Sequence, residues 1–280
     1  MSGMGFLRLV EVFPPLFRPG SKAGKIDVEG ALANLFEGVE TIKPFSDVIL
    51  VAAFKDPATL RMSPVFTAQA IRRETGMNAA PVIVVRDYNR PEFRSMVVTA
   101  IAGGLRTMMI VWGDDFGKGG PTNVRDYVSL AEALRDASDI ARKAGVHVDF
   151  LAPIDVSRLG KGGSRTARSR LSAGAKLLLA QPPAIDTGDL EKQAILLKRA
   201  GIEAKTLPGI FPFRSVKDLH ECEKKFGWRL PEKADNIARQ GPRGFLQAAR
   251  AVAVEAERSG LPGIYLSTRG DPGVAADVLG

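Results

Sequence analysis

Short apolar segments alternate with longer amphipathic segments along nearly the whole chain. Each of the first seven apolar segments precedes apolar residues at helical spacing, as in Val28–Ile42, Asn123–Ala144 and Arg243–Ser259. Only a short helix, Val274–Leu279, follows the eighth. The predicted strands are Leu7–Phe13, Asp47–Ala53, Pro81–Val85, Thr107–Trp112, His147–Ala152, Lys176–Gln181, Glu203–Ile210 and Gly263–Ser267. Eight strand–helix units in series predict a closed parallel sheet inside a ring of helices.

Residues 1–280 are therefore expected to form one domain, a (β/α)8 TIM barrel of the α/β class. The 280 residues suit such a barrel, which commonly has ~250. An open, doubly wound sheet is the alternative that periodicity alone leaves open. Glycines that end a helix before the next strand belong to this framework: Gly76, Gly104, Gly145, Gly174 and Gly201.

Several sequence features favour a soluble protein of the reducing cytoplasm, with no membrane partner. No apolar run approaches the ~20 residues that a membrane span requires. The N-terminal segment lacks the basic, apolar and small-residue regions of a signal peptide. The single cysteine, Cys222, excludes an internal disulfide and a zinc site built from cysteines.

The chain is basic, with a net charge of +8 from 39 Lys and Arg against 31 Asp and Glu. A basic net charge of this size is also found in proteins that bind nucleic acids. However, the basic residues are mostly scattered along predicted helices, and only Arg158–Arg170 is dense. Scattered charge is typical of a solvated surface, so we expect no nucleic-acid partner. An anionic small molecule would be attracted equally well.

In a barrel of this kind, functional residues lie at the carboxyl ends of the strands. Glu11 lies within an otherwise apolar strand and is expected to face the lumen or its mouth. Burial raises the pKa of a carboxyl group, which suits proton donation near neutral pH. A structural salt bridge with an arginine such as Arg86 is the alternative.

Asp114 and Asp115 follow the fourth predicted strand, where acidic side chains could hydrogen-bond a heterocycle, hold a metal or cap a helix. No histidine or further acidic cluster accompanies them, so we predict no metal site. The two histidines, His147 and His220, are interpreted as structural, which leaves a Ser/His/Asp or Cys/His centre without support.

A glycine-rich basic loop follows the fifth strand. Its cationic residues, Arg158, Lys161, Arg165, Arg168 and Arg170, could bind phosphate through guanidinium groups and backbone N–H groups. The loop does not match the G-x4-G-K-[ST] pattern of a P-loop, and no strand is followed by G-x-G-x-x-G. A merely solvated loop is the open alternative.

Five segments, in the same order along the chain, resemble motifs of the methylenetetrahydrofolate reductase family, and the chain is similar to a divergent member of it. The family's opening E-x-F-P-P strand, the turn into its third strand, its R-G-D segment, its A-G-A-…-T-Q strand and its P-G-I-x-P segment have counterparts here. These counterparts are Val10–Pro15, Thr75–Pro81, Val111–Asp114, Ala173–Gln181 and Pro208–Pro212.

The resemblance implies a barrel in which NAD(P)H reduces FAD, and FAD passes hydride to 5,10-methylenetetrahydrofolate to give 5-methyltetrahydrofolate. By position, Glu11 would be the general acid that helps to open the imidazolidine ring. Asp114 would lie near both flavin and pterin, and Gln181 would hydrogen-bond the pterin.

The chain departs from the family mainly on the flavin side. Ala80–Val85 has no histidine, Trp112 replaces an arginine, and Arg158–Arg170 replaces a segment that contains histidine. Two interpretations follow. Either FAD is bound and Arg165, Arg168 and Arg170 take its phosphates, or the protein works without flavin, as a reductase or as a folate-binding subunit or methyltransferase component of a one-carbon assembly. A homo-oligomer or a partner subunit is compatible with both.

Overall fold

A parallel sheet closes on itself to form a barrel. The computed structural model describes residues 5–17, 27–53, 60–113, 126–231 and 233–280. The strand order is β10-β11-β1-β3-β5-β6-β7-β8-β9, and only Pro208 separates the two strands at its ends, β9 (Thr206–Leu207) and β10 (Gly209–Ile210). Because β9 pairs with β8 and β10 pairs with β11, the two edges of the sheet belong to one segment. This closure confirms the barrel and rules out the open sheet.

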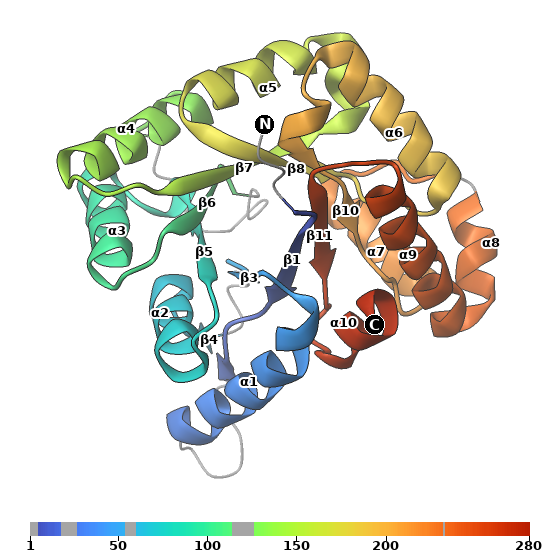
Figure 1. Ribbon diagram of the computed structural model, residues 1–280, viewed down its shortest axis with the longest axis horizontal. Coiled ribbons are helices and arrows are strands. Elements are labelled where there is room, and N and C mark those ends of the chain that lie inside the picture. Colours follow the sequence, from blue (N-terminus) through green and yellow to red (C-terminus); the bar gives the residue numbers. More distant parts are fainter. Residues whose placement is uncertain (1–4, 18–26, 54–59, 114–125, 232) are drawn as a thin grey trace.

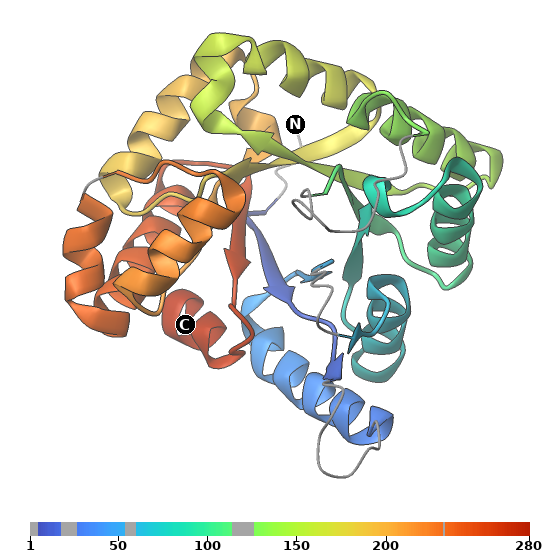
Figure 2. The same ribbon diagram turned by 180° about the vertical axis from the view of Figure 1, so that it is seen from behind.

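The helices surround the strands in both views of the molecule (Figures 1 and 2). The remaining strands of the barrel are β1 (Leu7–Val12), β3 (Val48–Val51), β5 (Ala79–Val84), β6 (Thr107–Val111), β7 (Asp149–Asp155), β8 (Ala175–Gln181) and β11 (Gly263–Ser267). The helices are α1 (Val28–Ile42), α2 (Pro64–Thr75), α3 (Arg90–Ala102), α4 (Leu130–Lys143), α5 (Gly163–Ser172), α6 (Thr187–Ala200), α7 (Val216–Phe226), α8 (Lys233–Arg239), α9 (Gly241–Arg258) and α10 (Gly273–Leu279). Two further strands, β2 (Leu16–Phe17) and β4 (Leu60–Arg61), form an antiparallel ribbon.

Alternation along the strands builds two cores. Leu9, Leu50 and Val82 belong to the core inside the barrel, whereas Val10 and Ile49 belong to the core between strands and helices. Successive side chains of a strand point to opposite faces, so one polar residue in phase with Leu9 must also face the lumen. Glu11 is that residue.

Three predicted boundaries require correction. The helix predicted to begin at Asn123 begins at Leu130, because the Ser129 side chain caps it by accepting from the Glu132 N–H. The predicted strand from His147 starts at Asp149 and continues to Asp155, which pairs with Gln181.

The third correction concerns the predicted strand Glu203–Ile210. It begins as a 3-10 helix over Glu203–Lys205 and then breaks at Pro208, which has no N–H to donate. The seventh unit also carries two additional helices, α7 and α8, before α9.

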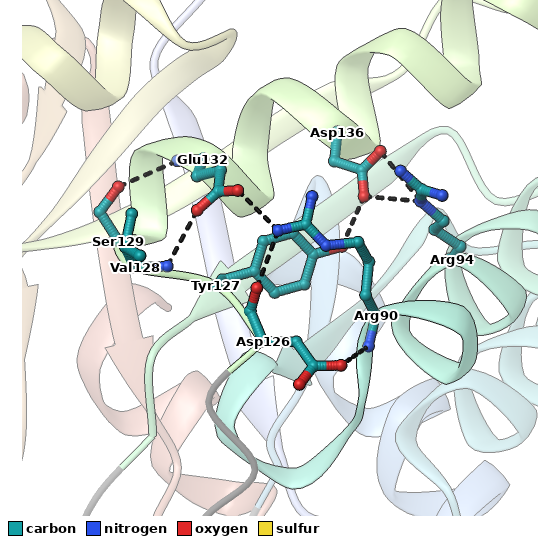
Figure 3. Close-up of polar contacts among 8 residues, drawn as sticks. All are labelled: Arg90, Arg94, Asp126, Tyr127, Val128, Ser129, Glu132 and Asp136. Carbon is teal, nitrogen blue, oxygen red and sulfur yellow. Dashed lines mark hydrogen bonds and ion pairs between the residues drawn. The ribbon is translucent and has the colours of Figure 1, made fainter.

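A polar cluster joins α3 to the residues that lead into α4 (Figure 3). Arg90 donates to Glu132 at 2.6 Å, and its guanidinium lies 4.4 Å from the ring centroid of Tyr127. The Tyr127 hydroxyl donates to Asp136 at 2.5 Å, and Arg94 donates to the same carboxylate at 2.8 Å. Burial, and then the hydrogen bond to Asp136, raise the pKa of Tyr127 well above its usual range. The cluster therefore holds the start of α4 against α3.

Replacing Tyr127 with phenylalanine should lower the free energy of unfolding by about 1–2 kcal/mol, because the Asp136 carboxylate loses a donor at a buried ring. Urea denaturation of Tyr127→Phe, Asp136→Asn and the double variant measures the effect. The double-variant cycle should show coupling between the two positions. Strictly additive losses would contradict a direct interaction.

Candidate functional site

A cavity of about 340 Å³ opens at the carboxyl ends of the strands. Its floor is apolar, with Val82, Met109 and Val111 among its residues. Glu11 on β1 and Gln181 on β8 both line it, and β11 and the β9–β10 segment lie between these two strands. The structure thus brings together two of the residues that the sequence singled out. Asp114 and Asp115 lie outside the described residues.

Glu11 is held by β11. The strand register places Glu11 directly opposite Ser267, and the Ser267 hydroxyl donates to Glu11 Oε2 at 2.6 Å. The Tyr265 phenol, two residues earlier on β11, also hydrogen-bonds the Glu11 carboxyl. Burial raises the pKa of Glu11, while the bonds from Ser267 and Tyr265 and the charge of Arg269 lower it by less. The result is a carboxyl group that keeps its proton more readily than an exposed glutamate does.

Arg269 places a positive charge at the same cavity. Its guanidinium donates to the Asp218 carboxylate and, at 3.2 Å, to the Cys222 sulfur, both on α7. Its φ is 55°, a left-handed conformation that costs a non-glycine residue about 1 kcal/mol or more. The positive charge that lowers the pKa of Glu11 is that of Arg269. The sequence-based candidate, Arg86, lies beside Gly113, two residues beyond β6.

An aromatic wall forms one side of the cavity. Phe226 and Trp228 are stacked with ring centroids 4.6 Å apart, and Phe211 meets Trp228 edge-on at 5.3 Å. Phe211 in turn meets Tyr265 edge-on at 5.7 Å. Such a wall beside a few convergent polar groups suits a flat ring system with hydrogen-bonding edges.

The three arginines proposed to hold phosphate lie on α5 and do not line this cavity. Arg165 and Arg168 are exposed, and Arg168 donates to the Ala200 carbonyl at the end of α6 at 3.3 Å. Arg170 donates to the Pro153 carbonyl of β7, and burial lowers its pKa. Two of the three guanidinium groups are therefore engaged with the protein main chain.

Both histidines contact carboxylate groups, and neither lines the mouth cavity. His147 contacts Asp149 at 3.0 Å near the amino ends of the strands, where Asp149 also binds Lys176. His220, on α7, contacts Glu223 at 2.9 Å, and this bond raises its pKa. A search of the described residues finds no cluster of three His, Cys, Asp or Glu side chains that could hold a metal, and no helix with the length and apolarity to cross a membrane.

Sequence reasoning missed Tyr265, Ser267, Arg269 and Trp228. The eighth strand ends in Ser267-Thr268-Arg269, so the rule that strand ends carry function would have identified Arg269. Trp228 follows α7 and reaches the cavity only because α7 packs over the mouth. No local signal marks it.

Two solved structures are similar to this chain. A Clostridium thermocellum protein that binds two copies of 5-methyl-5,6,7,8-tetrahydrofolic acid matches with a TM-score of 0.65 and 14% identity, over 98% of this chain and 95% of its own. A Bacillus subtilis HMG-CoA lyase matches with a TM-score of 0.52 and 13% identity, over 94% and 78%. At these identities the likeness establishes the shared fold. No protein-family model matches the sequence, and a comparison with curated proteins finds no match.

Proposed function

We propose that the mouth cavity binds a reduced folate carrying a one-carbon group, and that Glu11 donates a proton to it. The observation that carries the proposal is a carboxyl group with a raised pKa that shares an apolar, aromatic-walled cavity with a neutral amide, Gln181. A glutamine amide both donates and accepts, as recognition of a pterin edge requires. The folate-binding structural neighbour and the resemblance to methylenetetrahydrofolate reductases support the same substrate class.

The reaction we propose is reduction of 5,10-methylenetetrahydrofolate to 5-methyltetrahydrofolate with NAD(P)H. Glu11 gives its proton to N10 as the bond between N10 and the methylene carbon breaks, which leaves an iminium at N5. Hydride from NAD(P)H then adds to the methylene carbon. The Glu11 carboxylate left behind accepts hydrogen bonds from Ser267 and Tyr265 and lies in the field of Arg269. These groups stabilise the charge that proton donation creates.

The three arginines of α5 do not form a clamp for the diphosphate of FAD at this cavity. Arg168 and Arg170 bind main-chain carbonyls, and Arg165 lies on the exposed face of α5, so the three do not converge at the cavity. We therefore base no step on flavin. A second candidate, a non-redox folate-binding subunit or methyltransferase component, uses the same pterin contacts and accords with a neighbour described by its binding of 5-methyltetrahydrofolate.

The test combines calorimetric titration with 5-methyltetrahydrofolate and a turnover assay. The assay contains 5,10-methylenetetrahydrofolate with NADH or NADPH, with and without FAD. Binding together with turnover supports the reductase, and flavin-independent turnover would identify its cofactor requirement. Binding without turnover under any of these conditions favours the non-redox candidate. Absence of folate binding would overturn both.

Gln181→Leu should weaken folate binding about tenfold, since one hydrogen bond in a partly desolvated site is worth roughly 1–1.5 kcal/mol. Gln69→Leu, the same substitution on α2 away from this cavity, is the matched control and should leave the Kd unchanged. Calorimetry measures both. Equal Kd values for Gln181→Leu and the wild type would show that Gln181 does not hydrogen-bond the folate.

A further inference from the structure

Strand β11 places two hydroxyl groups beside one carboxyl group of the neighbouring strand β1. Glu11 and Ser267 are register partners of neighbouring parallel strands, and their side chains meet on the lumen face. Tyr265 precedes Ser267 by two residues, so it shares that face and reaches the same carboxyl group. Ser267 and Tyr265 are only 1% and 3% exposed, so both side chains are shielded from solvent.

We propose that Ser267 and Tyr265 are positioning residues that orient the Glu11 carboxyl group and determine which of its oxygens carries the transferable proton. The inference rests on the proposed role of Glu11 as proton donor. A protonated carboxyl group has one oxygen that donates and one that accepts. With the Ser267 hydroxyl donating to Oε2 at 2.6 Å, Oε2 is assigned as the accepting oxygen and Oε1 as the oxygen that carries the proton.

The same bonds ease release of the proton. Burial favours the neutral form of Glu11, and a carboxyl group that held its proton too tightly would be a poor acid near neutral pH. Hydrogen bonds from Ser267 and Tyr265 favour the ionised form, as does the charge of Arg269. They therefore offset part of the burial effect.

The other charged and titratable groups at this cavity act from α7 and the end of β11. Arg269 is already engaged by Asp218 and Cys222, which reduces its effect on Glu11. The residues that β3 places beside Glu11, Leu50 and Val51, are apolar. Among the residues that the structure describes, the titratable groups lining the cavity with Glu11 are Asp218, Glu221, Cys222, Lys225, Tyr265 and Arg269.

Thr268 offers a matched control in the neighbouring position. It is 1% exposed, like Ser267, and its hydroxyl donates at 2.8 Å to the main-chain carbonyl of Glu11. Loss of that hydroxyl removes its bond to the Glu11 main chain and the bond it accepts from the Gly270 N–H, but no bond to the Glu11 carboxyl group. Thr268→Val therefore separates an effect on the Glu11 carboxyl group from a general weakening of the contact between β1 and β11.

The deciding experiment follows the ionisation of Glu11 by NMR in ligand-free protein with carbon-13-labelled glutamate, its resonance assigned by its loss in Glu11→Gln. Ser267→Ala should raise the midpoint of the titration by about one pH unit, because the ionised form loses a donor. Tyr265→Phe should shift it in the same direction, whereas Ser267→Thr, which keeps a hydroxyl, and Thr268→Val should leave it near the wild-type value. An unchanged midpoint in a folded Ser267→Ala would overturn the proposal, as would an equal shift in Thr268→Val.

A kinetic measurement separates this proposal from the proposed function. If the protein reduces 5,10-methylenetetrahydrofolate, the acidic limb of the Ser267→Ala rate profile should move with the NMR midpoint, and Ser267→Thr should restore it. If the NMR shifts occur in a protein that does not turn over folate, the positioning of Glu11 stands and its role as folate acid fails. If the NMR midpoint of Glu11 shifts in Ser267→Ala but the pH–rate profile does not, the positioning role in catalysis is contradicted.

Discussion

Glu11→Gln is expected to lower the rate of 5,10-methylenetetrahydrofolate reduction by about 10²- to 10⁴-fold, the usual contribution of a positioned general acid. Glutamine keeps the shape of the side chain and can accept from Ser267, but it has no acidic proton to give to N10. Affinity for 5-methyltetrahydrofolate, which has no ring to open, should change less than about threefold. The loss should therefore appear in kcat rather than in Kd.

The stability of the same variant relative to the wild type should increase as the pH rises. The pKa of Glu11 is raised in the folded protein, so above the ordinary glutamate value of 4.5 the unfolded chain releases this proton before the folded chain does. The wild type thus loses stability as the pH rises through the folded pKa, and the loss levels off above it. Glutamine has no proton to lose, so Glu11→Gln escapes this penalty. Below the ordinary value the difference in stability between the two proteins should not depend on pH.

Steady-state kinetics, folate titration and urea denaturation between pH 4 and pH 9 measure the three effects. Glu191→Gln is the matched control, because Glu191 is exposed on α6 and does not line the cavity. It should leave kcat close to that of the wild type. Wild-type turnover in Glu11→Gln would exclude Glu11 as the acid, and a stability difference that shrinks with pH would contradict the raised pKa.

The sequence was sufficient to predict that Glu11 faces the lumen or its mouth, because a carboxylate within an apolar strand needs a polar surrounding there. It was also sufficient to place Gln181 at the mouth, because this polar residue ends an apolar strand of the barrel. Both inferences depend on strand period and strand ends, which are local properties. The barrel itself follows from the repetition of such units.

The partners of Glu11 depend on how the barrel closes. Ser267 and Tyr265 are distant from Glu11 in sequence, and they meet it only through the register between β1 and β11. That register is set by side-chain packing in both cores and by the turn into β11, which no short pattern encodes. Trp228 is further removed, since its position depends on how α7 docks over the mouth.

The arginines of α5 show where prediction from the sequence fails. A dense basic run predicts an anion clamp only if its guanidinium groups converge, and convergence depends on helix phase and on competing acceptors. In the fold, Arg168 and Arg170 find carbonyl oxygens of Ala200 and Pro153 instead. Main-chain acceptors of this kind are invisible in a sequence because every residue carries one.

Gly263→Ala is expected to destabilise the fold by about 3 kcal/mol or more, because it forces a side chain into the contact between β1 and β11 that aligns Glu11 with Ser267. Gly263 is the register partner of Leu7, and a Cβ at this position would lie 2.1 Å from the Leu7 carbonyl oxygen. Its φ of 153° is also a conformation that side chains rarely adopt. The obstacle is the backbone of β1, so it cannot be relieved by rotation of a flexible side chain.

Gly260→Ala separates the steric effect from the conformational one. Gly260 lies in the same connection between α9 and β11 and has a φ of 70°, but a Cβ there would meet open space. Its replacement should cost only the left-handed penalty of roughly 1–2 kcal/mol. Thermal and urea denaturation rank the two variants, and similar losses would show that the approach of β1 to Gly263 is not limiting. If Gly263→Ala stays folded, the Glu11 titration should also shift, because a displaced β11 moves Ser267 away from the carboxyl group.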